Sequence, residues 1–189
     1  MVDLFGQAEA VTRHATFAHE GQLRLTLTRR WVGGPHVCFI GHNPSTADHQ
    51  VDDPTVRRWM HFARAWGYAG FVAVNLYPIR ATDPAEARRW IDWQANGPDW
   101  HARDAIFQNH DVLIREAKAA ALVVACWGAI ARDQDWVKHV LENIATDVAP
   151  YPAVHVFGQT KDGAPIHPMA RGRMRVPDDA KPVLWRKGG

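Results

Sequence analysis

Four short apolar runs recur along the chain, and none of them alternates between apolar and polar residues as a half-exposed strand would. Largely apolar runs of this length are typical of strands that are buried on both faces of a sheet. The runs are Val37–Ile40, Phe71–Val74, Ala121–Cys126 and Ala153–Phe157. We therefore expect four central strands.

Helical patterns lie between these runs. Asp53–Pro54 and Asp83–Pro84 each place a capping side chain before a proline at the first helical position. Apolar residues then recur at helical spacing after both pairs. Two further helices are expected near residues 100–120 and 135–145. Strands that alternate with helices favour parallel pairing through right-handed crossovers.

The expected fold is therefore α/β, a three-layer α/β/α arrangement around a central, mostly parallel sheet of about four strands. Segments 14–19 and 23–31 read as an N-terminal hairpin or edge strands. Because no repeat or linker interrupts the chain, residues 1–189 are expected to form a single domain.

The composition is ordinary for a globular chain, with 47% hydrophobic and 22% charged residues among 189. The N-terminus lacks the features of a signal peptide, and no apolar run is long enough to span a bilayer. We therefore expect a cytoplasmic monomer with no membrane contact. Cys38 and Cys126 lie within apolar runs and are expected to be buried. Neither a cofactor nor a metal ion is predicted.

The net charge is only +2, but it is unevenly distributed. Residues 171–187 hold six basic residues against two acidic ones. Such a segment is suited to binding phosphates, or else it is a solvated and partly disordered tail.

Polar and glycine residues follow all four apolar runs. Gly41–Pro44 follows the first, Asn75 the second, Trp127–Gly128 the third, and His167–Pro168 comes after the fourth. Since the carboxyl ends of parallel strands meet at one edge, where α/β proteins bind ligands, we expect a site there. The side chains of Asn75 and His167 offer hydrogen-bond donors for a planar heterocycle.

This pattern resembles the uracil-DNA glycosylase superfamily. Gly41–Pro44 matches its first motif, Gly-x-Asn/Asp-Pro, in the Asn form of the mismatch-specific enzymes. Asn75 stands where members carry the asparagine that reads the uracil edge, and Trp127–Ala131 loosely resembles their third motif. His167–Pro168 matches the start of their late His-Pro-Ser motif. The resemblance implies a monofunctional enzyme of base excision repair that flips a base out of DNA and hydrolyses its glycosidic bond.

More of the chain resembles a bacterial family long described only as a domain of unknown function. Its hallmarks are Asn-Pro-Ser-x-Ala-Asp, Asp-Pro-Thr, Ala-Thr-Asp-Pro and a late His-Pro. They appear here as Asn43–Asp48, Asp53–Thr55, Ala81–Pro84 and His167–Pro168.

The glycosylase resemblance assigns roles to individual residues. His167 would stabilise the departing base, and Asn75 would recognise its edge. Asn43 would orient the attacking water, with Asp48 as a substitute base. The remaining base-binding candidates are His42, Ser45, Trp59 and Phe62. The DNA-binding candidates are Ser45, Thr46, Met169, Arg171 and Arg173.

Two departures from the glycosylase pattern affect specificity. Met169 stands in place of the motif serine, and Ser45 replaces the bulky aromatic residue of the uracil-specific type. We therefore expect a base range broader than uracil. Two other functions remain open: a hydrolase of free nucleosides or nucleotides, which would have no use for the basic segment, and a non-catalytic module that binds damaged bases.

Overall fold

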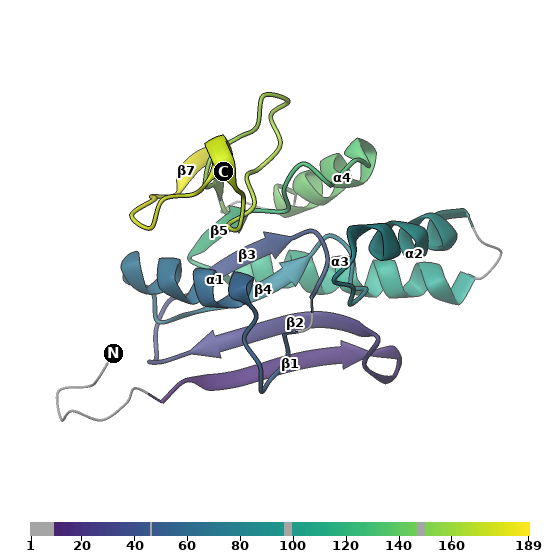
Figure 1. Cartoon of the computed structure of the whole chain (residues 1–189), viewed down its shortest axis with the longest axis horizontal. Coiled ribbons are helices and arrows are strands. Elements are labelled where there is room, and N and C mark those ends of the chain that lie inside the picture. Colours follow the sequence, from purple (N-terminus) through teal and green to yellow (C-terminus); the bar gives the residue numbers. More distant parts are fainter. Residues whose placement is uncertain (1–9, 46, 97–99, 147–149) are drawn as a thin grey trace.

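A computed structural model describes residues 10–45, 47–96, 100–146 and 150–189, and these residues build one seven-stranded sheet (Figure 1). The strands are β1 (Thr12–Ala18), β2 (Leu23–Arg30), β3 (Val37–Gly41), β4 (Gly70–Asn75), β5 (Leu122–Ala125), β6 (Val154–Val156) and β7 (Val183–Arg186). Their order across the sheet is β1-β2-β4-β3-β5-β6-β7. The expected α/β class is confirmed.

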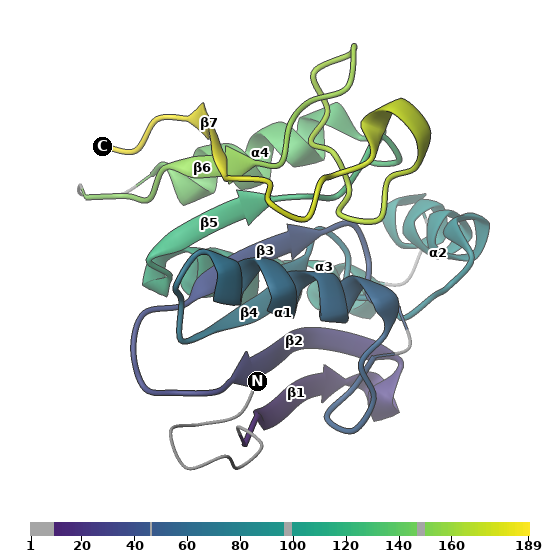
Figure 2. The ribbon, with the colours of Figure 1, turned by 60° about the vertical axis from the view of Figure 1, so that its left-hand side comes forward.

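The four apolar runs form the middle of this sheet. Strands β4, β3, β5 and β6 are neighbours in that order and run parallel, so their carboxyl ends share one edge (Figure 2). The outer pairs β1–β2, β2–β4 and β6–β7 are antiparallel. The sheet is therefore mixed and larger than the mostly parallel sheet of about four strands that was expected.

The difference arises at the two edges, where unpaired backbone groups of a parallel core would otherwise face solvent. The N-terminal hairpin, with the 3-10 turn η1 (His19–Gly21) at its tip, joins the sheet because Leu27–Arg30 of β2 pairs with β4. At the other edge β7 pairs with β6. Both edges of the parallel core are thus covered by antiparallel strands.

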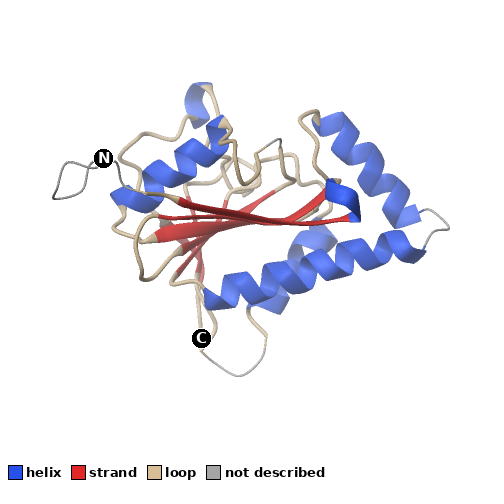
Figure 3. Ribbon diagram, turned by 90° about the horizontal axis from the view of Figure 1, so that it is seen from below, coloured by secondary structure: helices blue, strands red, loops and turns tan. Residues whose placement is uncertain are grey.

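Helices cover both faces of the sheet (Figure 3). They are α1 (Pro54–Ala65), α2 (Pro84–Asn96), α3 (Trp100–Ala119) and α4 (Gln134–Ile144). Asp53 caps α1 by accepting a hydrogen bond from Val56 N at 2.8 Å. Asp133 caps α4 in the same way through Trp136 N at 2.9 Å. The four expected helices are confirmed.

Residues within one strand face opposite layers. Val37 and Phe39 of β3 pack with α1, whereas Cys38 and Ile40 pack with α3 and α4. This two-sided burial explains why β3 carries apolar residues on both of its faces. Cys38 and Cys126 are both buried free thiols, as expected.

The basic C-terminal segment is ordered. After the 3-10 turn η2 (Gly172–Met174), Val176 is buried and Ala180 O accepts a hydrogen bond from Trp66 Nε1 of α1 at 2.8 Å. Arg58 of α1 forms an ion pair with Asp178. The interpretation of this segment as a partly disordered tail is therefore wrong, because these contacts and the pairing of β7 hold it against the rest of the protein. Among the described residues, no helix combines the length and the apolar character needed to cross a membrane.

Candidate functional site

A cavity of about 390 Å³ lies at the carboxyl ends of β3, β4 and β5. Its size falls within the usual range of small-ligand sites. Six residues that the sequence singled out line it together: His42, Asn43, Ser45, Trp59, Asn75 and His167. The parallel register of the central strands brings these residues together from distant parts of the chain.

Asn75 is the last residue of β4, and only 1% of its surface is exposed. Its backbone carbonyl is held by Asn109 Nδ2 at 2.9 Å. Among the described residues, its own side-chain Nδ2 has no hydrogen-bond partner. A buried donor without a partner costs roughly 1–3 kcal/mol. A ligand that accepts a hydrogen bond in this cavity would remove that cost.

His42 and Asn43 form a hydrogen-bonded pair that fixes the proton on the imidazole. Asn43 Nδ2 donates to Ala81 O at 2.9 Å and to Pro44 O at 3.0 Å. Its Oδ1, which can only accept, therefore faces His42 Nδ1 at 3.0 Å. Nδ1 of His42 then carries the proton, and Nε2 keeps a free lone pair. Burial lowers the pKa of His42, although the hydrogen bond to Asn43 opposes this shift.

This pairing bears on the prediction that Asn43 orients the attacking water. Its amide N–H groups donate to backbone carbonyls and its Oδ1 accepts from His42, which leaves one lone pair of the oxygen open to a water. The His42 ring also packs edge-on against Tyr77 at 5.4 Å between centroids.

His167 shows the opposite arrangement. Its Nδ1 accepts a hydrogen bond from Met169 N at 3.2 Å, so the proton of the neutral ring lies on Nε2. Burial lowers the pKa of His167, and the nearby Asp53 carboxylate partly offsets this. Gly128 allows the close approach, because a Cβ there would lie 3.3 Å from His167 Cβ and its φ is +78°.

Two charged residues of the cavity were missed as site residues. Arg24, 2% exposed, donates from Nη1 to Ala47 O at 2.6 Å, and burial lowers its pKa to about 10. It therefore remains a cation at neutral pH. Asp53 caps α1 and also lines the cavity. An arginine inside the apolar segment LRLTL was the available signal for Arg24.

Some predicted residues lie outside this cavity. The Asp48 carboxylate accepts from Gln50 N at 2.7 Å and from Val51 N at 2.9 Å, so it stabilises a turn. Phe62 is fully buried and packs on Phe157 with ring centroids 4.6 Å apart. Asp48 does not line the cavity, and Phe62 belongs to the core between α1 and the sheet, because it points from the inner face of that helix.

Trp59 is the aromatic residue of α1 that does line the cavity, and it stacks on Phe39 with centroids 5.5 Å apart. Thr46 lies outside the described residues.

The loop after His167 presents exposed cations. Arg171 immediately precedes η2, and Arg173 lies within it. Both arginines are exposed, as is Met169. Within the described part of the chain, neither arginine has an ion-pair partner. Nor do the described residues contain a cluster of three or more His, Cys, Asp or Glu side chains that could hold a metal ion.

Comparison with known proteins gives one result. A family described as a protein of unknown function, DUF1643, matches residues 24–169, which include all the cavity-lining residues named above. Neither the curated proteins nor the solved structures contain a match. Because the match spans most of the sequence, the chain belongs to the DUF1643 family.

Proposed function

We propose that this protein is a DNA glycosylase of the uracil-DNA glycosylase type, which hydrolyses the glycosidic bond of uracil and of some modified bases. The observation that carries the proposal is the buried side-chain Nδ2 of Asn75, which has no hydrogen-bond partner among the described residues and lies in a cavity shared with two histidines of opposite tautomer. The parallel strands β4-β3-β5-β6 would correspond to the core of that superfamily, and no cofactor is needed.

Asn75 would recognise the base. An amide offers one donor and one acceptor side by side, which complements the carbonyl and N–H of a pyrimidine edge. The side chain is buried at the end of β4, so its orientation is fixed before the base arrives. A base without the matching edge would leave the Asn75 amide unsatisfied and would bind poorly.

His167 would stabilise the leaving base. As the glycosidic bond breaks, its electron pair moves onto the base, and negative charge develops on the base oxygen. The neutral imidazole donates from Nε2–H, because Nδ1 is engaged by Met169 N. A preorganised donor of this kind is worth on the order of 3–4 kcal/mol in the transition state.

His42 would take the proton of the attacking water. Its Nε2 has a free lone pair, and its lowered pKa keeps the ring neutral at neutral pH. The water oxygen bonds to the anomeric carbon while its proton moves to His42. Asn43 is a positioning residue in this scheme. The Asp53 carboxylate, which lines the cavity as Asp48 does not, would stabilise positive charge on the sugar.

DNA would be held by the exposed arginines of the segment that follows His167. Arg171 and Arg173 lie four and six residues after His167 and have no ion-pair partner among the described residues. Such groups bind backbone phosphates. This favours DNA over a free nucleoside as the substrate.

The test uses an oligonucleotide with a single uracil and, separately, free deoxyuridine. Base release is measured by alkaline cleavage of the abasic strand and by chromatography of uracil. We expect release from the oligonucleotide, and a loss of about a hundredfold or more in His167→Ala and in Asn75→Ala. The matched controls His14→Ala, on an exposed position of β1, and Asn143→Ala, on α4, should retain the wild-type rate.

Three results would contradict the proposal. Wild-type rates in both His167→Ala and Asn75→Ala would show that this cavity is not the active site. Release from deoxyuridine alone would indicate a nucleoside hydrolase. Tight binding of the oligonucleotide without release would indicate a non-catalytic module.

A further inference from the structure

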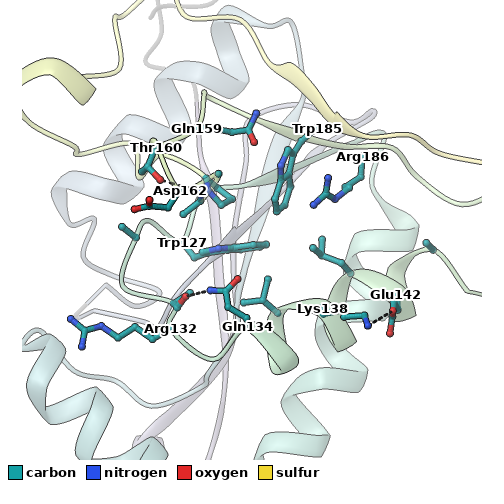
Figure 4. Close-up of a pocket in the computed structure, with 18 of the residues that line it drawn as sticks. Trp127, Arg132, Gln134, Lys138, Glu142, Gln159, Thr160, Asp162, Trp185 and Arg186 are labelled. Atoms are coloured by element: carbon teal, nitrogen blue, oxygen red, sulfur yellow. Dashed lines mark hydrogen bonds and ion pairs between the residues drawn. The ribbon is translucent and has the colours of Figure 1, made fainter.

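A second cavity has a volume of about 980 Å³, and Figure 4 shows residues that line it. It is enclosed by α4, by the loop 159–165 after β6, and by β7. Trp127 and Ala129, just after the end of β5, line both cavities, so the two spaces share part of one wall. The proposed function makes no use of this larger space.

Two tryptophans give the second cavity an aromatic wall. Trp127 and Trp185 meet edge to face, with centroids 5.7 Å apart and ring planes at 67°. Trp185 is only partly buried, and the Arg186 guanidinium lies 4.5 Å from the centroid of its ring. Figure 4 shows Trp185 between Arg186 on one side and Gln159 and Thr160 on the other, facing into the space. Trp185 and Arg186 both line the cavity, so the ring and the guanidinium beside it are presented to the same space.

The charges around this wall are mainly positive. Four basic residues line the cavity against two acidic ones: Arg132, Lys138, Arg186 and Lys187 against Glu142 and Asp162. The Lys138–Glu142 contact is long, at 3.8 Å, and both side chains are exposed. Within the described residues Arg132 has no ion-pair partner. An aromatic face with surrounding cations is the arrangement that binds single-stranded nucleic acid.

We propose that this second cavity binds the neighbouring nucleotide of a single DNA strand whose reactive base occupies the first cavity. The neighbouring base would stack on Trp185, and its phosphate would contact Arg186 or Arg132. The apolar face of α4, with Val137 and Leu141, would pack against the sugar. Only an unpaired nucleotide can expose its base face to stacking, so the subsite selects single strands. This inference rests on the proposed function for the identity of the first cavity's ligand.

The experiment measures binding without excision. Fluorescence anisotropy reports the dissociation constant of labelled oligothymidylate, which contains no uracil, and of the same sequence in a duplex. We expect Trp185→Leu to weaken single-strand binding about tenfold or more, because the variant loses the ring on which a base stacks. Leucine keeps the position apolar. Trp185→Phe should retain most of the affinity.

The matched control is Trp93→Leu on α2, at a tryptophan that is 53% exposed and lines neither cavity; its affinity should equal that of the wild type. Duplex affinity should change little in any of the three variants. Thermal unfolding checks that Trp185→Leu remains folded, and the comparison of Phe with Leu separates stacking from packing.

The subsite is overturned if the wild-type protein fails to bind oligothymidylate, or if Trp185→Leu binds single strands as well as the wild type does. An equal loss of affinity in Trp185→Phe and Trp185→Leu would also overturn it. Phenylalanine keeps an aromatic ring on which a base can stack, so a stacking role requires the two variants to differ. Single-strand binding that depends on Trp185 without any uracil release would keep the subsite and remove the proposed function. Uracil release at the same rate in the wild type and in Trp185→Leu would keep the proposed function and remove the subsite.

Discussion

Gly41 and Asn75 are cross-strand partners at the ends of β3 and β4, and they approach so closely that a Cβ on Gly41 would lie 2.6 Å from Asn75 Oδ1. No side-chain carbon occupies such a distance without displacement. The absence of a side chain at Gly41 therefore leaves room for the amide that we assign to base recognition.

Gly41→Ala should displace the Asn75 side chain and reduce base release about tenfold or more, since a small misplacement of a binding group has a large kinetic effect. The measurement is single-turnover release of uracil. Gly33→Ala is the matched control, because a Cβ there meets nothing within 4 Å. Equal rates for the two variants would mean that Asn75 does not need its present orientation.

The rate should depend on pH through the two cavity histidines. Burial lowers the pKa of both His42 and His167, and the proposed mechanism uses both rings in the neutral form. The rate should thus stay constant near neutrality and fall only in acid, with a midpoint below the ordinary histidine value of about 6.5. A pH profile of single-turnover rates tests this, and a midpoint above that value would contradict it.

The same shifts act on stability. A histidine whose pKa is lowered by folding binds protons more readily in the unfolded chain. The free energy of unfolding should therefore decrease as the pH falls below about 6.5.

Ser45 lines the cavity. Under the proposed function it would take the place of the aromatic residue that uracil-specific glycosylases carry. Ser45→Tyr should narrow the base range by discriminating against 5-substituted pyrimidines, while release of uracil itself continues. A missing methyl group is worth only roughly 1–3 kcal/mol even in a fitted site, so we expect a selectivity change of about tenfold or more. Competition between uracil- and thymine-mismatch substrates measures it, and an unchanged ratio would show that Ser45 does not contact the base.

Asp52 neutralises a fully buried arginine. Its carboxylate binds Arg29 at 2.7–2.8 Å, and Arg29 has no exposed surface. Asp52→Ala leaves that charge without its partner and should lower the free energy of unfolding by roughly 3–5 kcal/mol. The control Asp178→Ala removes an exposed ion pair with Arg58 and should cost less than about 1 kcal/mol. Urea denaturation distinguishes the two, and similar midpoints would contradict the argument.

The local pattern of the sequence determined much of this structure. The central strands carry apolar residues toward two helix layers, as Phe39 and Ile40 of β3 do, and this made them recognisable without any tertiary information. Asp53 followed by Pro54 marked the start of α1 for the same local reason. The convergence of His42, Asn75 and His167 followed from parallel strand order, since carboxyl ends of neighbouring parallel strands meet at one edge.

Tertiary structure decided what depends on partners distant in the sequence. The sequence could not show that the Asn43 side chain donates a hydrogen bond to Ala81 O and accepts one from His42. Nor could it show that Arg24 of β2 lines the cavity. It could not assign β7 to the sheet, because Val183–Arg186 is short and mostly exposed and exists as a strand only through its pairing with β6. Hydrogen-bond partners, tautomers and sheet edges are properties of the assembled fold, and a one-dimensional pattern of polarity does not encode them.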